Sequence, residues 1–240
     1  MKKLIIGFVL GVALSLTINA FAGKPEQPAE PTPTPTIIMV TPEPVPTPTP
    51  TIIYEVALTD LETVVKDTKD SCVMIYAYYP DGSTSQASGW VYNGYVITAK
   101  HAVEGAEKID IFTDGELYGV SGTVYYSDLK LDVAIIRTDT GKPSVTLGDS
   151  DKLMEGQKLV AISSPSGTQN MIDECVYSGK VITVDQKHIG ITETFIEAGS
   201  SGGAVFNQNS ELIGLVYVGN DGFAGALPIN DIKSILNKLK

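Results

Sequence analysis

Two adjacent serines, Ser200 and Ser201, lie in the segment EAGSSGGAV between one glycine and a pair of glycines. A serine hydroxyl becomes a nucleophile only when a neighbouring base removes its proton and that base is held in the right tautomer. Acyl transfer also needs hydrogen-bond donors directed at the developing oxyanion, and glycines let the backbone turn its N–H groups toward a substrate. Because glycine-rich turns are common, this segment predicts chemistry only if the chain supplies a base.

The chain has only two histidines, His101 and His188, so an imidazole base must be one of them. In YVITAKHAVEGA, the apolar run from Tyr95 to Thr98 leads into His101, which we therefore expect at the end of a strand. The neighbours of His188 in DQKHIG are polar, which predicts an exposed strand or turn residue. His101 is the candidate base, and the alternative is a core histidine satisfied by a backbone carbonyl.

The carboxylate best suited to orient this imidazole is Asp132, in DLKLDVAIIRTD. Residues 131–136 are mostly apolar and predict a buried strand, where a carboxylate is costly unless hydrogen bonds compensate it. An imidazole N–H would provide such a bond. Asp110, Asp114 and Asp128 lie in more polar or alternating segments and are expected at the surface. A solvated aspartate at a strand end is the alternative for Asp132.

Two cysteines, Cys72 and Cys175, complete the set of reactive side chains. The spacings of the cysteines and histidines match no common zinc site, so no metal or other cofactor is expected. In an oxidising compartment, a disulfide between Cys72 and Cys175 would close a loop of about 100 residues and stabilise the fold by several kcal/mol. Two buried free thiols are the alternative, because a sequence does not show whether the side chains meet.

The N-terminal part of the chain has the composition of an export and linker region. Residues 1–22 contain two lysines, a long apolar stretch and the pattern Ala20-Phe21-Ala22, which together indicate a secretory signal peptide. The same stretch is nearly long enough for an uncleaved membrane anchor, and in that case it alone would contact the membrane. Residues 23–57 contain PTPTPTII twice, which favours an extended stalk or a disordered linker. We expect the rest of the chain to lie outside the cytoplasm.

The bulk composition limits the classes of partner. The 240-residue chain has 17 basic and 28 acidic residues, a formal net charge of −11, and no basic run beyond its first three residues. This balance argues against binding to nucleic acids or anionic membrane surfaces, because both require clustered Lys and Arg. A hydrophobic content of 43% is sufficient for a buried core.

The globular domain is expected over residues 58–240. Thr59 and Glu62 form a capping box for a short helix that ends near Lys69, and the apolar spacing over 230–239 predicts a closing helix. Short apolar or alternating runs between the two helices indicate an all-β sandwich or a pair of barrels. The expected strands are 72–79, 87–92, 95–99, 108–113, 118–126, 132–137, 157–162, 174–184, 189–194, 203–206, 211–218 and 223–227.

Taken in order, the segments ITAKH, LDVAII and GSSGGAV are similar to motifs of the trypsin-like serine proteases, and more narrowly of the HtrA-like bacterial branch. The resemblance covers about residues 58–230 and includes GLVYVGNDGFAGALPIN. It implies two packed six-stranded β-barrels, with an active site in the cleft between them. Since the sequence ends soon after the last expected strand, we expect no PDZ domain of the kind that many HtrA relatives carry.

The same resemblance implies a role for each motif residue. Ser201, which directly precedes Gly202, would be the nucleophile. His101 would act as general base and then general acid, while Asp132 holds its ring. The N–H groups of Gly199 and Ser201 would form the oxyanion hole.

Three residues depart from the family pattern. Ser200 stands where digestive relatives carry an aspartate that pairs with a newly cut N-terminus, so we expect no such activation. Ala204 replaces a usual proline. Lys100 replaces a small or polar residue beside His101, and we expect its side chain to point to solvent.

In the family, the first specificity pocket is built from segments that correspond here to Phe195, to Leu215, Val216 and Tyr217, and to Ala226. None of these residues is acidic, which disfavours cleavage after Lys or Arg and favours small or aliphatic side chains. The strand edge around Val216 is expected to pair with the substrate backbone. The alternative is that all these residues belong to the barrel core.

The resemblance therefore implies a secreted or surface-tethered serine endopeptidase that acts on polypeptides. One alternative is a catalytically inactive, protease-like binding module, and another is an esterase for non-peptide substrates. The sequence indicates neither the natural substrate nor the oligomeric state.

Overall fold

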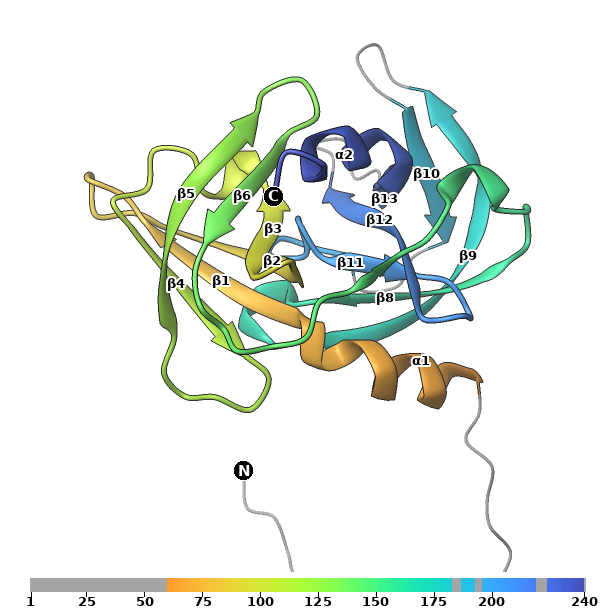
Figure 1. Cartoon of the computed structure of the whole chain (residues 1–240), viewed down its shortest axis with the longest axis horizontal. Helices are drawn as coiled ribbons and strands as arrows, with labels where there is room; N and C mark the ends of the chain where they lie inside the picture. Colours follow the sequence, from red (N-terminus) through yellow and green to blue (C-terminus); the bar gives the residue numbers. More distant parts are fainter. Residues whose placement is uncertain (1–59, 183–186, 193–195, 219–223, 240) are drawn as a thin grey trace, which may run out of the picture. The chain divides into compact units, whose positions relative to one another are not determined.

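The computed structural model describes residues 60–182, 187–192, 196–218 and 224–239 (Figure 1). The expected signal peptide or anchor and the Pro/Thr-rich linker lie outside the described residues. Within the part that is described, no helix is long and apolar enough to span a membrane. The described residues all belong to one unit of the chain, Tyr54–Lys240.

The first half of this unit forms a closed antiparallel barrel with the strand order β1-β2-β3-β6-β5-β4. Its interior is filled by aliphatic side chains such as Val73, Ile75 and Ile111, which alternate with outward-facing residues along their strands. The strands are β1 (Cys72–Tyr78), β2 (Thr84–Tyr92), β3 (Tyr95–Ala99), β4 (Lys108–Thr113), β5 (Val120–Asp128) and β6 (Val133–Arg137).

The second half forms another six-stranded barrel, in which β11-β8-β9-β10-β13-β12 follow one another and a β11–β12 pairing closes the ring. A two-residue strand, β7, pairs in parallel with the first two residues of β12, Glu211 and Leu212. The strands are β7 (Thr146–Leu147), β8 (Lys158–Ser163), β9 (Met171–Ile182), β10 (Lys187–Thr192), β11 (Ala204–Phe206), β12 (Glu211–Val218) and β13 (Ala224–Pro228).

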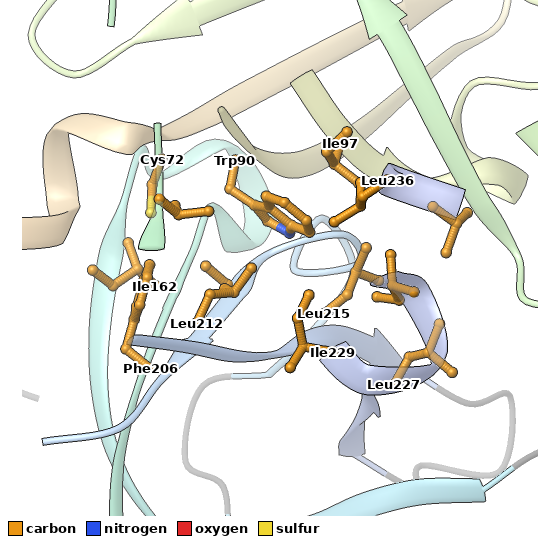
Figure 2. Packing of buried hydrophobic residues seen from close by; sticks show 14 of the residues in the cluster. Cys72, Trp90, Ile97, Ile162, Phe206, Leu212, Leu215, Leu227, Ile229 and Leu236 are labelled. Atoms are coloured by element: carbon orange, nitrogen blue, oxygen red, sulfur yellow. The ribbon is translucent and has the colours of Figure 1, made fainter. Parts of the chain in front are cut away.

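A continuous apolar core fills the seam between the barrels. It combines Trp90 and Ile97 of the first barrel with Phe206 and Leu215 of the second. Figure 2 shows Ile97 beside Leu236, which comes from the C-terminal helix α2 (Ile229–Leu236). The N-terminal helix α1 (Asp60–Thr68) adds to the same core. Burial of large apolar side chains from both halves stabilises one arrangement of the two barrels.

The all-β prediction of two six-stranded barrels with a helix at each end is confirmed. Each expected strand is present, with ends that differ by a few residues. Only β7 lacks a counterpart in the sequence analysis, because a pair of residues carries no periodic signal.

The two cysteines are free thiols in separate parts of the core. Cys72 belongs to the seam core and its Sγ donates to Thr68 O at 3.6 Å, whereas Cys175 lies in the core of the second barrel. Burial raises the pKa of both thiols, that of Cys175 to about 12. The structure therefore has two buried free thiols in place of the disulfide.

Candidate active site

His101 lies in a 3₁₀ turn (Lys100–Ala102) that directly follows β3. Strand β3 pairs with β6 so that Ala99 lies opposite Val133, the first residue of β6. The register continues by one residue, because Lys100 N–H donates to Asp132 O at 2.9 Å. This pairing places the histidine turn beside the aspartate that precedes β6.

Asp132 holds His101 through two hydrogen bonds. Its Oδ2 lies 2.5 Å from His101 Nδ1, and its Oδ1 accepts from the backbone N–H of His101 at 2.9 Å. With Nδ1–H directed at the carboxylate, Nε2 carries the lone pair and is free to accept a proton. The histidine side chain is 49% exposed and the aspartate side chain 23% exposed, so the ring is open to a substrate.

The environment of Asp132 differs in one respect from the prediction. The residue lies just before β6, with φ +55°, and not within the buried strand itself. This left-handed conformation is tolerated by aspartate. The compensating imidazole bond that the sequence analysis expected is present.

The Ser201 loop precedes β11 and is folded by two backbone hydrogen bonds between residues three positions apart. Ser200 N–H donates to Glu197 O at 2.9 Å, and Gly203 N–H donates to Ser200 O at 3.0 Å. Gly199 and Gly202 have φ +97° and +87°, a conformation that strongly favours glycine. Ser201 is 7% exposed.

This loop is packed directly on the first barrel. Ser88 N–H, in β2, donates to Ser201 O at 2.9 Å. A Cβ added to Gly202 would collide with Ser88 O and Thr98 Oγ1 and would lie 2.8 Å from Ala99 N. Since Ala99 is two residues before His101, the serine loop and the histidine turn are neighbours across the seam.

The structure joins two of the three expected catalytic side chains by a hydrogen bond, namely His101 and Asp132. Among the described residues, no hydrogen bond joins the Ser201 hydroxyl to the imidazole. Such bonds are often long in enzymes without substrate and shorten only when the substrate binds.

The two backbone N–H groups of the residues that flank Ser200 donate to no acceptor in the described part of the chain. They belong to Gly199 and Ser201, whereas the N–H groups of Ser200, Gly202 and Gly203 all donate. These two N–H groups, near an exposed imidazole, can donate to an anionic oxygen of a bound substrate.

Ser200 has a different environment from its neighbour. It is fully buried, and its Oγ accepts from Ser163 Oγ at 3.1 Å and from Glu197 N–H at 3.2 Å. Its hydroxyl is therefore part of the packing under the loop, and Ser201, at 7% exposed, is the more accessible of the two serines.

Two expectations about polar residues are wrong. Lys100 does not point to solvent: its side chain is 7% exposed and pairs with that of Glu104, four residues later. Lys100 lines a small cavity together with residues such as Val103 and Ala134. His188 is not exposed either, because β10 lies between β9 and β13 and its ring stacks on Tyr217 at 4.9 Å.

The expected specificity residues divide into three groups. Leu215, Val216 and Ala226 are at most 2% exposed and lie in core clusters. Tyr217 is partly exposed, and Phe195 lies outside the described residues. Val216 is also not the free strand edge, since its N–H donates to Gly203 O and its C=O accepts from Gly202 N–H.

Two residues at this site were missed by the sequence analysis. Ser88 Oγ donates to Gly199 O at 2.8 Å and accepts from Ser164 N–H at 2.7 Å. Gln86, two residues earlier in β2, also bonds to the loop that contains Ser164. No local pattern marks either residue, because their partners lie about 80 to 110 positions away.

The sequence of this chain is similar to those of known proteases. A family model for the trypsin-like peptidase domain matches residues 87–215. A probable periplasmic serine endoprotease, DegP-like, of Pseudomonas putida is 33% identical over 169 residues, which cover 65% of this chain and 35% of that protein. A serine protease Do-like HtrA of Lactococcus lactis is 26% identical over 233 residues, 76% of this chain and 57% of that protein. This chain spans about a third of the length of the DegP-like relatives.

Solved structures share the fold. The Rv3671c protease from M. tuberculosis, in its active form, superposes with a TM-score of 0.67 at 22% identity and covers 83% of this chain and 94% of that one. An HtrA-type protease with a tripeptide gives a TM-score of 0.67 at 21% identity and covers 73% and 62% of the two chains.

Proposed function

This chain belongs to the trypsin-like peptidase family, in its HtrA-like branch, and we propose that it is a serine endopeptidase that hydrolyses polypeptides through an acyl-enzyme intermediate. The observation that carries the proposal is the pair of hydrogen bonds that the Asp132 carboxylate accepts from His101, beside a serine loop packed against the end of β3. Together these features supply an oriented base and a nearby hydroxyl, which acyl transfer requires.

In the proposed mechanism, Ser201 Oγ attacks the scissile carbonyl while His101 Nε2 accepts its proton. Asp132 keeps Nδ1 protonated and stabilises the imidazolium that forms. The N–H groups of Gly199 and Ser201 donate to the oxyanion of the tetrahedral intermediate. His101 then protonates the leaving amine, and a water molecule activated by the same imidazole releases the acyl group.

A protease-like binding module without activity is the second candidate. The missing hydrogen bond between Ser201 and His101 favours it, because an imidazole that never reaches the hydroxyl would leave the serine unreactive. The two candidates differ in the reactivity of one side chain.

A fluorophosphonate probe on the full chain tests this difference. We expect wild type to be labelled at Ser201, Ser201→Ala to be unlabelled, and Ser200→Ala, the matched neighbouring serine, to retain labelling. His101→Ala should lower peptide hydrolysis by about 10⁴-fold or more, since loss of a triad member leaves only the oxyanion hole and substrate binding. Labelling that persists in Ser201→Ala would reassign the nucleophile, and a folded wild type that never reacts would support the binding module.

We also propose that the domain works outside the cytoplasm. We further propose that it prefers substrates with a small or aliphatic residue directly before the scissile bond. The location is supported by the leader-like residues 1–22 and by relatives whose names describe them as periplasmic. The preference is supported by the absence of acidic residues among the five aligned pocket positions. Mass determination of the exported chain distinguishes a cleaved leader from an anchor, and a peptide library measures the preference.

A further inference from the structure

The orientation of one peptide unit decides whether the proposed oxyanion hole exists. The N–H of Gly199 belongs to the peptide unit between Ala198 and Gly199, whose carbonyl accepts from Ser166 N–H at 2.9 Å. In a trans peptide, the N–H and C=O groups point in opposite directions. The bond from Ser166 therefore holds the Gly199 N–H on the other side, where the described residues offer it no acceptor.

The donor of that bond lies in a strained turn. Ser166 is the middle residue of the 3₁₀ turn Pro165–Gly167 and has φ 48° and ψ 33°, in the left-handed region. A non-glycine residue in this region costs about 1–2 kcal/mol, so neighbouring contacts must hold it there.

The side chain of Gln86, from β2 of the first barrel, brackets this turn on both sides. Gln86 Oε1 accepts from Gly167 N–H at 2.7 Å, and Gln86 Nε2 donates to Ser164 O. These two partners are the residues one after and two before Ser166. The amide also lies against the serine loop itself, because a Cβ added to Gly199 would be 2.7 Å from Gln86 Oε1.

We propose that Gln86 is a positioning residue that holds the Ala198–Gly199 peptide in the orientation needed for oxyanion stabilisation. It acts through the 165–167 turn: with Gln86 in place, Ser166 stays left-handed and its N–H fixes the Ala198 carbonyl. Without it, the turn relaxes, the peptide unit is free to rotate, and the Gly199 donor is lost. This inference rests on the proposed function and names a residue outside its catalytic set.

The effect of replacing Gln86 on catalysis should be separable from any effect on folding. Ser88 makes its own bonds to Ser164 N–H and Gly199 O, which hold the neighbouring peptide unit and do not involve Gln86. Gln86 is only partly buried, so a side chain of similar length can replace it with little loss of packing.

The test compares Gln86→Met with wild type in the full chain. We expect kcat to fall about 10- to 100-fold with KM within about twofold, because loss of one oxyanion donor costs 10²–10³ in kcat and this loss is partial. The affinity of a peptide aldehyde, whose adduct places an oxyanion in the hole, should fall by a similar factor. The affinity of the matching peptide alcohol, which has no carbonyl for Ser201 to attack and so forms no oxyanion, should stay unchanged.

A matched control is available in the adjacent segment. Gln169 Nε2 donates to Thr113 O at 2.6 Å and so also links the second barrel to the first, but it makes no bond to the 165–167 turn. Gln169→Met should keep kcat and aldehyde affinity within twofold of wild type. Gln86→Glu, which retains the acceptor for Gly167 N–H and loses the donor to Ser164 O, should show an intermediate loss and carries the test if Gln86→Met does not fold.

Wild-type kcat and aldehyde affinity in the folded Gln86 variants would overturn the inference while leaving the proposed function intact. An equal loss in Gln169→Met would also overturn it, because the effect would then belong to the barrel contact in general. A wild-type chain that does not react at Ser201 would refute the proposed function, and this inference with it.

Discussion

Replacing Gly202 by alanine tests whether the serine loop lies against the strand that leads to His101. A Cβ at this position would collide with Ser88 O and Thr98 Oγ1 and would approach Ala99 N to 2.8 Å. Two of these atoms are backbone atoms in paired strands. Thr98 Oγ1 is held by its own bond to Ser88 O at 2.6 Å. No flexible side chain can move aside, so the loop itself must shift.

The expected cost has two parts. Gly202 has φ +87°, and an L-residue in a left-handed conformation costs about 1–2 kcal/mol. Forcing an extra methyl group into a packed site adds about 1–3 kcal/mol. The substitution should therefore lower the free energy of unfolding by about 2–5 kcal/mol.

A matched glycine separates the two parts. Gly82 has φ +82°, and an added Cβ there meets nothing within 4 Å, so Gly82→Ala should show only the conformational cost. Urea unfolding of both variants, made in a Ser201→Ala background to prevent self-digestion, gives the two free energies from the midpoints at constant m-value. Their difference of about 1–3 kcal/mol measures the close approach.

The same substitution should also impair the chemistry in an otherwise wild-type chain. A shift of about 1 Å in the nucleophile can lower a rate 10²-fold, so labelling of the folded Gly202→Ala protein should slow by that order. If Gly202→Ala were no more destabilising than Gly82→Ala, the serine loop would not touch the first barrel. The proposed convergence of Ser201 and His101 would then be wrong.

Two further predictions concern buried titratable groups. Burial lowers the pKa of His188 below its usual value of about 6.5, which it keeps in the unfolded chain. Because the unfolded state then binds a proton more readily than the folded state, the free energy of unfolding should fall as the pH drops below about 6.5. Urea midpoints between pH 8 and 5 should show this decline in wild type and a smaller one in His188→Phe; equal slopes would contradict the assignment. Burial raises the pKa of the Cys72 and Cys175 thiols, that of Cys175 to about 12, so a thiol reagent at pH 8 should react only after unfolding. Rapid reaction of the native protein would show that these side chains are accessible.

The strands could be predicted from the sequence because each is a short apolar or alternating run bounded by turn residues. Tyr95–Ala99 is followed by the polar residues Lys100 and His101, and Glu211–Val218 is preceded by a turn. In contrast, Thr146–Leu147 is a strand only because β12 offers it a parallel partner. Two residues carry no period, so nothing local could identify it.

The burial of His188 and Lys100 could not be inferred from their neighbours. His188 follows three polar residues, but its strand is paired on both edges and its ring contacts that of Tyr217, 29 positions away. Lys100 is buried because a tight turn brings Glu104 to its ammonium group. The tertiary environment therefore overrides the polar residues before His188, whereas Lys100 pairs with a partner only four positions away.

The order of the three motifs identified the candidate catalytic residues, but their contacts depend on strand register. His101 meets Asp132 because Ala99 pairs with Val133, and a shift of one residue would turn the aspartate away. No pattern in the sequence predicts this register or the contact between the serine loop and β2. The same holds for Gln86 and Ser88, whose partners belong to the other barrel.

The serine loop has few bonds of its own, and this explains why the site depends on the seam. Its carbonyls at Gly199 and Ser201 are held by Ser88, and Gly202 rests on the end of β3, so the first barrel determines the shape of a loop that belongs to the second. The apolar core around Trp90 keeps the barrels in the one position where these bonds form. A change that loosens this core would move His101 away from Ser201 and would release the loop carbonyls that Ser88 holds. Packing at the seam would therefore support the proposed catalysis as well as the stability of the fold.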